Sequence, residues 1–174
     1  MALGARVNVS AMLTSAERRK LPASRETENL LNGGMLEGAA LFDLRFNVVE
    51  CTAWLLFDCK GALQIRGGNT AVVVLRAVRA LEWHTPALGP RMWQRVEGWA
   101  TNSISASERV LTLALEVGDV RASFSAAEFF IGDVPGGDEA PPDFEEASDE
   151  EMTTRLQNWN SEFESVSASF FDTV

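Results

Sequence analysis

The sequence has few of the side chains that build metal centres and catalytic sites. Its 174 residues include one histidine, His84, and two cysteines, Cys51 and Cys59. Two cysteines cannot form a disulfide framework, and with a single histidine they match no zinc-binding spacing. The acidic residues 138–143 lack the spacing of a calcium-binding loop and are interrupted by Pro141-Pro142. We therefore predict no metal and no cofactor, and we interpret both cysteines as thiols without chemistry of their own.

Catalytic motifs are also missing. A Ser-His-Asp or Cys-His arrangement would have to use His84, but no Gly-x-Ser-x-Gly elbow accompanies it. The stretch Gly67-Gly68-Asn69-Thr70 precedes a predicted strand and lacks the lysine of a phosphate-binding loop. These absences favour a protein that is not an enzyme, and we expect His84 to be dispensable.

Long apolar runs are absent as well. No run reaches the roughly 18 to 20 residues that a membrane-spanning helix needs. Residues 1–13 lack the basic start and apolar core of a secretory signal, so we expect a cytoplasmic protein with no membrane partner. The chain is 46% hydrophobic and 23% charged, which at this length suits one folded domain.

Basic residues are scarce in the second half of the chain. Residues 1–100 hold 12 Lys+Arg against 9 Asp+Glu, whereas residues 101–174 hold 3 against 16. Residues 138–151 contain eight acids and no basic residue, so we expect a self-repelling, solvated connector. An acidic surface attracts a basic partner and disfavours nucleic acid. The predicted partner-binding residues are Asp138, Glu139, Asp143, Glu145, Glu146, Asp149 and Glu150.

The stretch from Leu41 to Trp83 carries the strand patterns. Apolar residues occupy the even positions from Phe42 to Val48, the period of a strand with one buried face. Residues 53–57 and 71–75 are apolar on both faces, which indicates central strands covered on both sides by helices. The alternation of apolar and polar residues becomes irregular near Arg76 or Ala77, which predicts a β-bulge.

Further elements are predicted on either side of this stretch. Gly118-Asp119 between two apolar runs predicts a hairpin turn, and residues 129–131 and 165–170 predict short strands. Two short helices are expected over 15–21 and 24–33. A capping box at Ser148 and Glu151 predicts a C-terminal helix. Its apolar stripe is Met152, Leu156, Trp159 and Phe163.

Together these patterns predict an α+β fold. We expect a mainly antiparallel sheet of about six to eight strands, with short N-terminal helices and a C-terminal amphipathic helix packed on it. The chain would form a single domain, 1–174. Its parts would be a helical lead (1–38), a sheet core (39–134), an acidic connector (135–148), and a C-terminal helix with a candidate terminal strand (149–174).

A family resemblance rests on several of these segments. Five short segments occur in this order along the chain: Leu41-Phe-Asp-Leu-Arg-Phe, Leu55-Leu-Phe-Asp, Val72-Val-Val-Leu-Arg-Ala-Val, Phe129-Phe-Ile-Gly-Asp-Val-Pro and Pro141-Pro-Asp-Phe. The pattern resembles small actinobacterial proteins grouped with immunity proteins of polymorphic toxin systems. This resemblance implies a bacterial, non-enzymatic, cytoplasmic inhibitor whose partner is a toxin domain. None of the matching residues implies a catalytic role.

A second hypothesis is kept from a different functional class. The chain has five tryptophans and ten phenylalanines but no tyrosine. Most of these rings are expected in the core, because aromatic residues dominate protein cores. The alternative function is a small-molecule-binding domain or enzyme with a site in a sheet cavity near Trp54, Trp83, His84 and Trp99. The oligomeric state stays open.

Overall fold

The computed structural model describes residues 6–13, 34–65, 67–84, 94–105, 108–136, 148, 150 and 156–172. Within them lie ten strands, which form one antiparallel sheet, and a 3-10 helix, η1 (Val9–Leu13). The strands are β1 (Arg6–Asn8), β2 (Ala40–Asn47), β3 (Thr52–Asp58), β4 (Thr70–Arg76), β5 (Ala80–His84), β6 (Gln94–Ser105), β7 (Glu108–Leu115), β8 (Gly118–Phe124), β9 (Ala126–Asp133) and β10 (Glu162–Asp172). None of the described helices is long and apolar enough to cross a membrane.

The predicted α+β class is wrong, because the described part of the chain is almost entirely antiparallel strand. The helices expected over 15–21 and 24–33 lie outside the described residues. The predicted C-terminal helix is wrong for Leu156, Trp159 and Phe163, since residues 156–161 form bends, turns and irregular structure and β10 follows. There the chain bonds to a neighbouring strand, β9, so its backbone groups are satisfied without a helix.

Two bent strands close the sheet on itself. β4 continues through a bend at Ala77, where the backbone has a positive φ of 49°, into β5. The bulge predicted near this point is instead a break between two strands. β8 likewise continues through Ser125 into β9. β4 pairs with β9 and β5 with β8. Hydrogen bonds from Ser125 N to Arg76 O (3.0 Å) and from Arg79 N to Ser123 O (2.9 Å) keep the two chains together through the bend.

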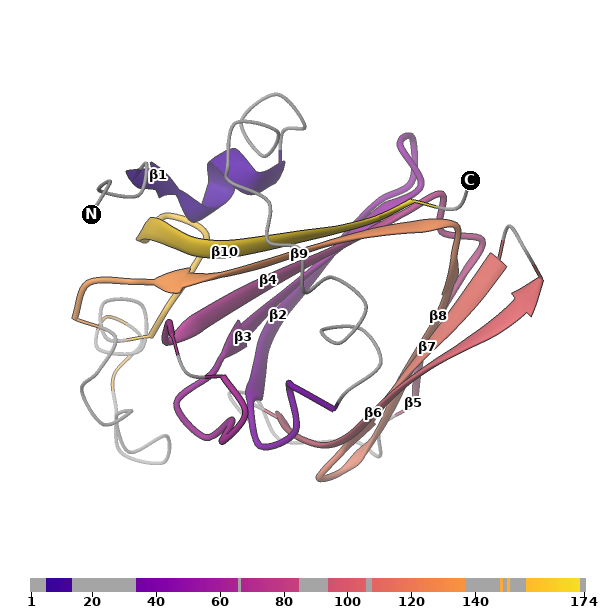
Figure 1. Cartoon of the computed structure of the whole chain (residues 1–174), viewed down its shortest axis with the longest axis horizontal. Coiled ribbons are helices and arrows are strands. Elements are labelled where there is room, and N and C mark those ends of the chain that lie inside the picture. The colour runs from indigo at the N-terminus through magenta and orange to yellow at the C-terminus, as the bar shows by residue number, and fades with distance from the viewer. Residues whose placement is uncertain are drawn as a thin grey trace.

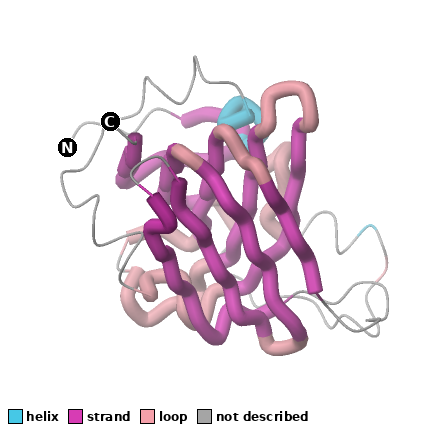
Figure 2. Tube along the Cα trace, turned by 90° about the vertical axis from the view of Figure 1, so that its right-hand side faces the viewer, coloured by secondary structure: helices cyan, strands magenta, loops and turns pink. Residues whose placement is uncertain are grey.

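The closed sheet is flattened into two layers. β10, β9, β4, β3 and β2 run across one layer, and β6, β7 and β8 run steeply across the other (Figure 1). Neighbouring strands lie side by side along each layer (Figure 2). β2 and β6 join the layers on the side away from the bends, but they pair only at Ala40 and Leu41.

Apolar side chains fill the space between the layers. Leu55, Val73 and Phe129 from one layer and Leu111 and Phe124 from the other belong to this cluster, and all are buried. β3 and β4 are buried along both faces, as the sequence predicts. The second layer of strands, rather than a helix, covers their inner face.

A smaller apolar cluster covers the outer face of β3, β4 and β9. Trp54, Val72 and Phe130 on the sheet contact residues from both ends of the chain, among them Val9 of η1 and Trp159. These two end segments are joined by a backbone hydrogen bond from Ser10 N to Trp159 O (2.6 Å). The outer face is therefore closed by η1 and the turn that precedes β10.

The turn around Trp159 is attached to β2 by polar contacts. The indole Nε1 of Trp159 donates a hydrogen bond to the Asp43 carboxylate, and the Arg45 guanidinium lies 4.8 Å from the centre of the Trp159 ring. Arg45 Nε also lies 3.4 Å from Asp43 Oδ2. These contacts join positions that are more than a hundred residues apart in the chain.

The predicted hairpin between β7 and β8 is confirmed, with a small shift in its turn. The turn residues are Glu116 and Val117, and Gly118 is already the first residue of β8, with a positive φ of 99°. Glycine adopts this backbone conformation without steric cost, which explains its place directly after the turn.

Candidate functional site

The hairpin that connects β2 and β3 ends in exposed apolar residues. Phe46 is 42% exposed, Val48 75% and Val49 93%, and we call these three residues the apolar tip. The Asn47 side chain shapes the turn, because its Oδ1 accepts hydrogen bonds from the backbone N–H groups of Val49 (2.9 Å) and Glu50 (3.2 Å). The tip is thus held in place by its own turn.

The position of Phe46 on β2 bears on the exposure of the tip. Phe46 lies on the same face of β2 as Leu44, which packs against the interior cluster. The described part of β6 pairs with the opposite end of β2, at Ala40 and Leu41, and Phe46 is partly exposed. The alternating pattern placed Phe46 and Val48 on a buried face, and that interpretation is wrong for both.

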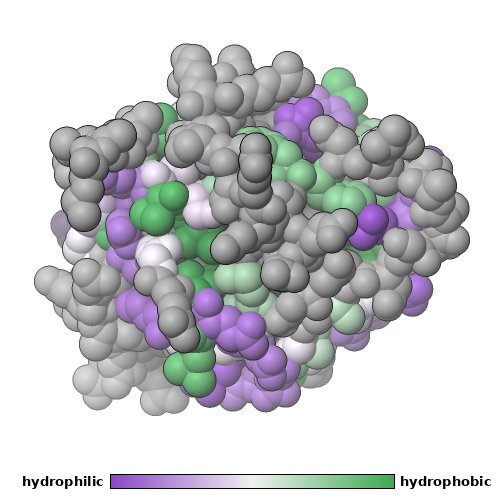
Figure 3. All heavy atoms as spheres, in the orientation of Figure 1, coloured by the Kyte–Doolittle hydropathy of each residue, from purple (hydrophilic) through white to green (hydrophobic). Residues whose placement is uncertain are grey.

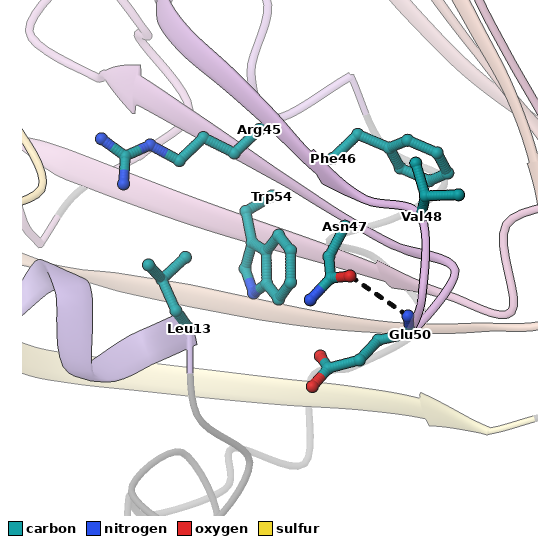
Figure 4. A pocket seen from close by; sticks show the side chains of 7 residues that line it. All are labelled: Leu13, Arg45, Phe46, Asn47, Val48, Glu50 and Trp54. Atoms are coloured by element: carbon teal, nitrogen blue, oxygen red, sulfur yellow. Dashed lines mark hydrogen bonds between the residues drawn. The ribbon is translucent and has the colours of Figure 1, made fainter.

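A hollow of about 430 Å³ lies beside the apolar tip. β2 and β3 supply most of its wall, and η1 supplies the rest. Its lining residues are Leu13, Arg45, Phe46, Asn47, Val48, Glu50 and Trp54, seen in Figure 4. Arg45 and Trp54 are direct cross-strand neighbours on the outer face of the sheet. The hollow therefore opens on that face and not into the interior.

Three polar groups in the hollow have unused hydrogen-bonding capacity. The Trp54 side chain is only 5% exposed, and its buried Nε1 has no hydrogen-bond partner. The Asn47 amide nitrogen and the Glu50 carboxylate point to the region beneath the Trp54 ring (Figure 4), and neither bonds to a described residue. Arg45 is engaged by Asp43 and Trp159. The arrangement offers donors and one negative charge to a ligand, but no nucleophile with a neighbouring base.

The acidic residues predicted to bind a partner are almost all outside the described residues. These are Asp138, Glu139, Asp143, Glu145, Glu146 and Asp149. Glu150, which the structure does describe, is exposed. The assignment of this segment to partner binding stays a prediction.

The structure does not bring together the four residues of the alternative site. Trp54 lies on the outer face of β3 opposite Val74 of β4, whereas Trp83 and His84 lie at the far end of β5. Trp83 is 46% exposed, and His84 Nδ1 lies 3.4 Å from the exposed Asp119 Oδ2. The side chain of the fourth residue, at position 99, is outside the described part of the structure.

The loop after β3 contains a buried acid and a buried thiol. Burial raises the pKa of the Asp58 carboxyl, and the Lys60 backbone N–H and ammonium group oppose this shift. Burial and the Asp58 charge also raise the pKa of Cys59, so this thiol stays protonated at neutral pH. Cys59 and the exposed Cys51 are both free thiols. The raised pKa of Cys59 is the opposite of the lowered pKa that marks a reactive cysteine.

The raised pKa of Asp58 predicts a pH-dependent effect of Asp58→Asn. The folded wild type binds this proton more tightly than the unfolded chain, so the contribution of Asp58 to stability is largest in acid and is lost as pH rises through the folded pKa. Asparagine cannot titrate, yet it can still accept the bond from Lys60 N. The Tm of the variant minus that of the wild type should therefore rise between about pH 4, near the ordinary aspartate pKa, and pH 7. A difference that falls or stays constant across this range contradicts the assignment.

In the described part of the chain, no group of three or more His, Cys, Asp or Glu side chains lies close enough to hold a metal ion. Comparison of the sequence and the structure with protein-family models, curated proteins and solved structures found no match.

Proposed function

We propose that the chain is a non-enzymatic protein-binding protein, an immunity-like inhibitor that covers a basic toxin domain in the cytoplasm. The observation that carries the proposal is the apolar tip, Phe46, Val48 and Val49, at the end of the β2–β3 hairpin. Hydrophobic side chains reach the surface in more than one place (Figure 3), and single exposed residues need no explanation. Three within four positions, beside a hollow, are typical of an interaction site.

The charge of the chain supports a basic partner. The net charge is −10, and the acid is concentrated in residues 101–174. Interfaces commonly have an apolar centre and a polar rim, and rim charges mainly accelerate association. In the proposed complex the apolar tip forms the buried centre, and the acidic residues 138–150 steer the partner.

Replacing Val49 by aspartate tests the tip. Leu63→Asp is a matched control, because Leu63 is also 93% exposed but follows the opposite end of β3. We expect Val49→Asp to weaken binding of a partner purified from the native host by at least about tenfold, since it places a charge in the apolar centre of the interface. Leu63→Asp should leave the affinity and the Tm unchanged.

The two variants and the acidic segment separate the possible outcomes. Equal affinities for Val49→Asp and Leu63→Asp would exclude the tip as the binding surface. Replacing Asp143, Glu145 and Glu146 by their amides should chiefly lower the association rate at low salt. An unchanged association rate would show that the acidic segment is only a solvated connector.

A further inference from the structure

We infer that the hollow beside the apolar tip binds an extended basic segment of the partner. A main-chain carbonyl of that segment accepts a hydrogen bond from Trp54 Nε1, and its lysine or arginine side chain pairs with Glu50. The inference rests on the proposed function, because it assigns one part of the partner to one part of this surface.

The need for an acceptor comes from Trp54. Its indole N–H is buried and has no partner, although buried polar groups in folded proteins nearly always have one. An indole nitrogen can only donate, so a ligand that satisfies it must bring an acceptor such as a carbonyl oxygen. The Asn47 amide nitrogen, which also points beneath the Trp54 ring, offers a second donor to the same group (Figure 4).

The need for a cation comes from Glu50. Among the described residues it is the only acid in the lining, and its carboxylate forms no ion pair with another described residue. Arg45, the only basic residue among the described lining residues, already contacts the Asp43 carboxylate and the Trp159 ring. A lysine or arginine can therefore pair with Glu50 while its aliphatic stem packs on apolar lining residues such as Leu13 and Val48.

A peptide fits these requirements better than a small molecule. The hollow opens at the protein surface beside the turn that carries Val48 and Val49, so a partner covering the tip also reaches the hollow. Each residue of an extended segment presents a main-chain carbonyl beside a side chain, which supplies the acceptor and the cation together. The acidic chain as a whole favours a basic segment over an acidic one.

The test follows the Trp54 indole N–H signal by NMR, after assignment with Trp54→Phe. The wild type is titrated with acetyl-Val-Thr-Lys-Thr-Val-amide and with peptides that carry norleucine or glutamate in place of the lysine. We expect the lysine peptide to shift the signal in a saturable way and to bind most tightly. Glu50→Gln should weaken its binding about fivefold, as expected for an exposed ion pair. Glu116→Gln, an exposed acid on the other layer, should have no effect.

Three results would overturn the inference. These are a Trp54 signal that no peptide moves, equal binding of the lysine and glutamate peptides, and a Glu50→Gln variant that binds like the wild type. If lysine amide saturated the shift of the Trp54 signal at the same concentrations as the lysine peptide, the hollow would be a site for small cations and not for a peptide. If the peptides fail while Val49→Asp still weakens partner binding, the inference falls and the proposed function stands. If the peptides bind while Val49→Asp leaves the affinity for the partner unchanged, the proposed function is wrong but the peptide site in the hollow stands.

Discussion

Replacing Trp159 by alanine is expected to lower the free energy of unfolding by about 3 to 5 kcal/mol, the usual range for a buried large aromatic side chain. The side chain is 4% exposed and packs with Trp54, Val72 and Phe130 over the outer face of the sheet. Its loss would open a cavity and also remove the hydrogen bond to Asp43. Urea unfolding followed by circular dichroism measures the change.

Two further variants define the origin of this effect. Trp159→Phe keeps an aromatic ring but cannot donate to Asp43, so it should cost about 1 to 3 kcal/mol. Trp83→Ala removes a tryptophan that is 46% exposed, and its effect should stay below that of Trp159→Ala. If Trp159→Ala lost partner binding while its unfolding free energy was unchanged, the turn before β10 would be an interface and not a structural contact.

Phe124→Ala should destabilise the protein by a similar amount, about 3 to 5 kcal/mol, but through the interior cluster. Phe124 is fully buried between the layers and directly precedes the bend at Ser125. The bend is held by hydrogen bonds on both sides, so the surrounding backbone has little freedom to collapse into the cavity.

Phe46→Ala is the matched control for this prediction. It removes the same side chain from the 42% exposed apolar tip, so its effect on unfolding should be small, whereas its effect on partner binding should be large. A loss of stability from Phe46→Ala equal to that from Phe124→Ala would mean that the tip is part of the core. That result would remove the main support for the proposed function.

The proposed binding surface depends on the way in which the sheet closes. β2 is paired with β3 along most of its length, and within the described residues it is paired with β6 at Ala40 and Leu41. The end of β2 that carries the apolar tip is thus the end away from this pairing. A turn that is held by its own hydrogen bonds loses less conformational entropy on binding, which suits an interaction site.

Part of the candidate site could be recognised in the sequence. Trp54, which lines the hollow, is one of the residues named for the alternative site. The pair Val48-Val49 was the available signal for an exposed apolar tip, and both residues lie in the turn between β2 and β3. The alternation from Phe42 obscured it, because Phe46 does share a face with Leu44, which packs against the interior cluster, and yet is 42% exposed.

Local periodicity by itself determined the strands and their degree of burial. The runs 53–57 and 71–75 are fully buried strands, and the irregular phase at Ala77 is a bend. The serine alternation near the C-terminus lies within β10. Each of these features depends on neighbours in the chain, which a single sequence records directly.

Only the tertiary structure decided what covers each buried face. An apolar face requires a cover, but its pattern is the same whether a helix or a second layer of strands supplies it. Closure of the sheet, the pairing of Trp159 with Asp43 and the exposure of Phe46 all depend on contacts between segments distant in the chain. The free energy of such a contact depends on both segments together. The periodicity of one segment therefore does not reveal which other segment it packs against.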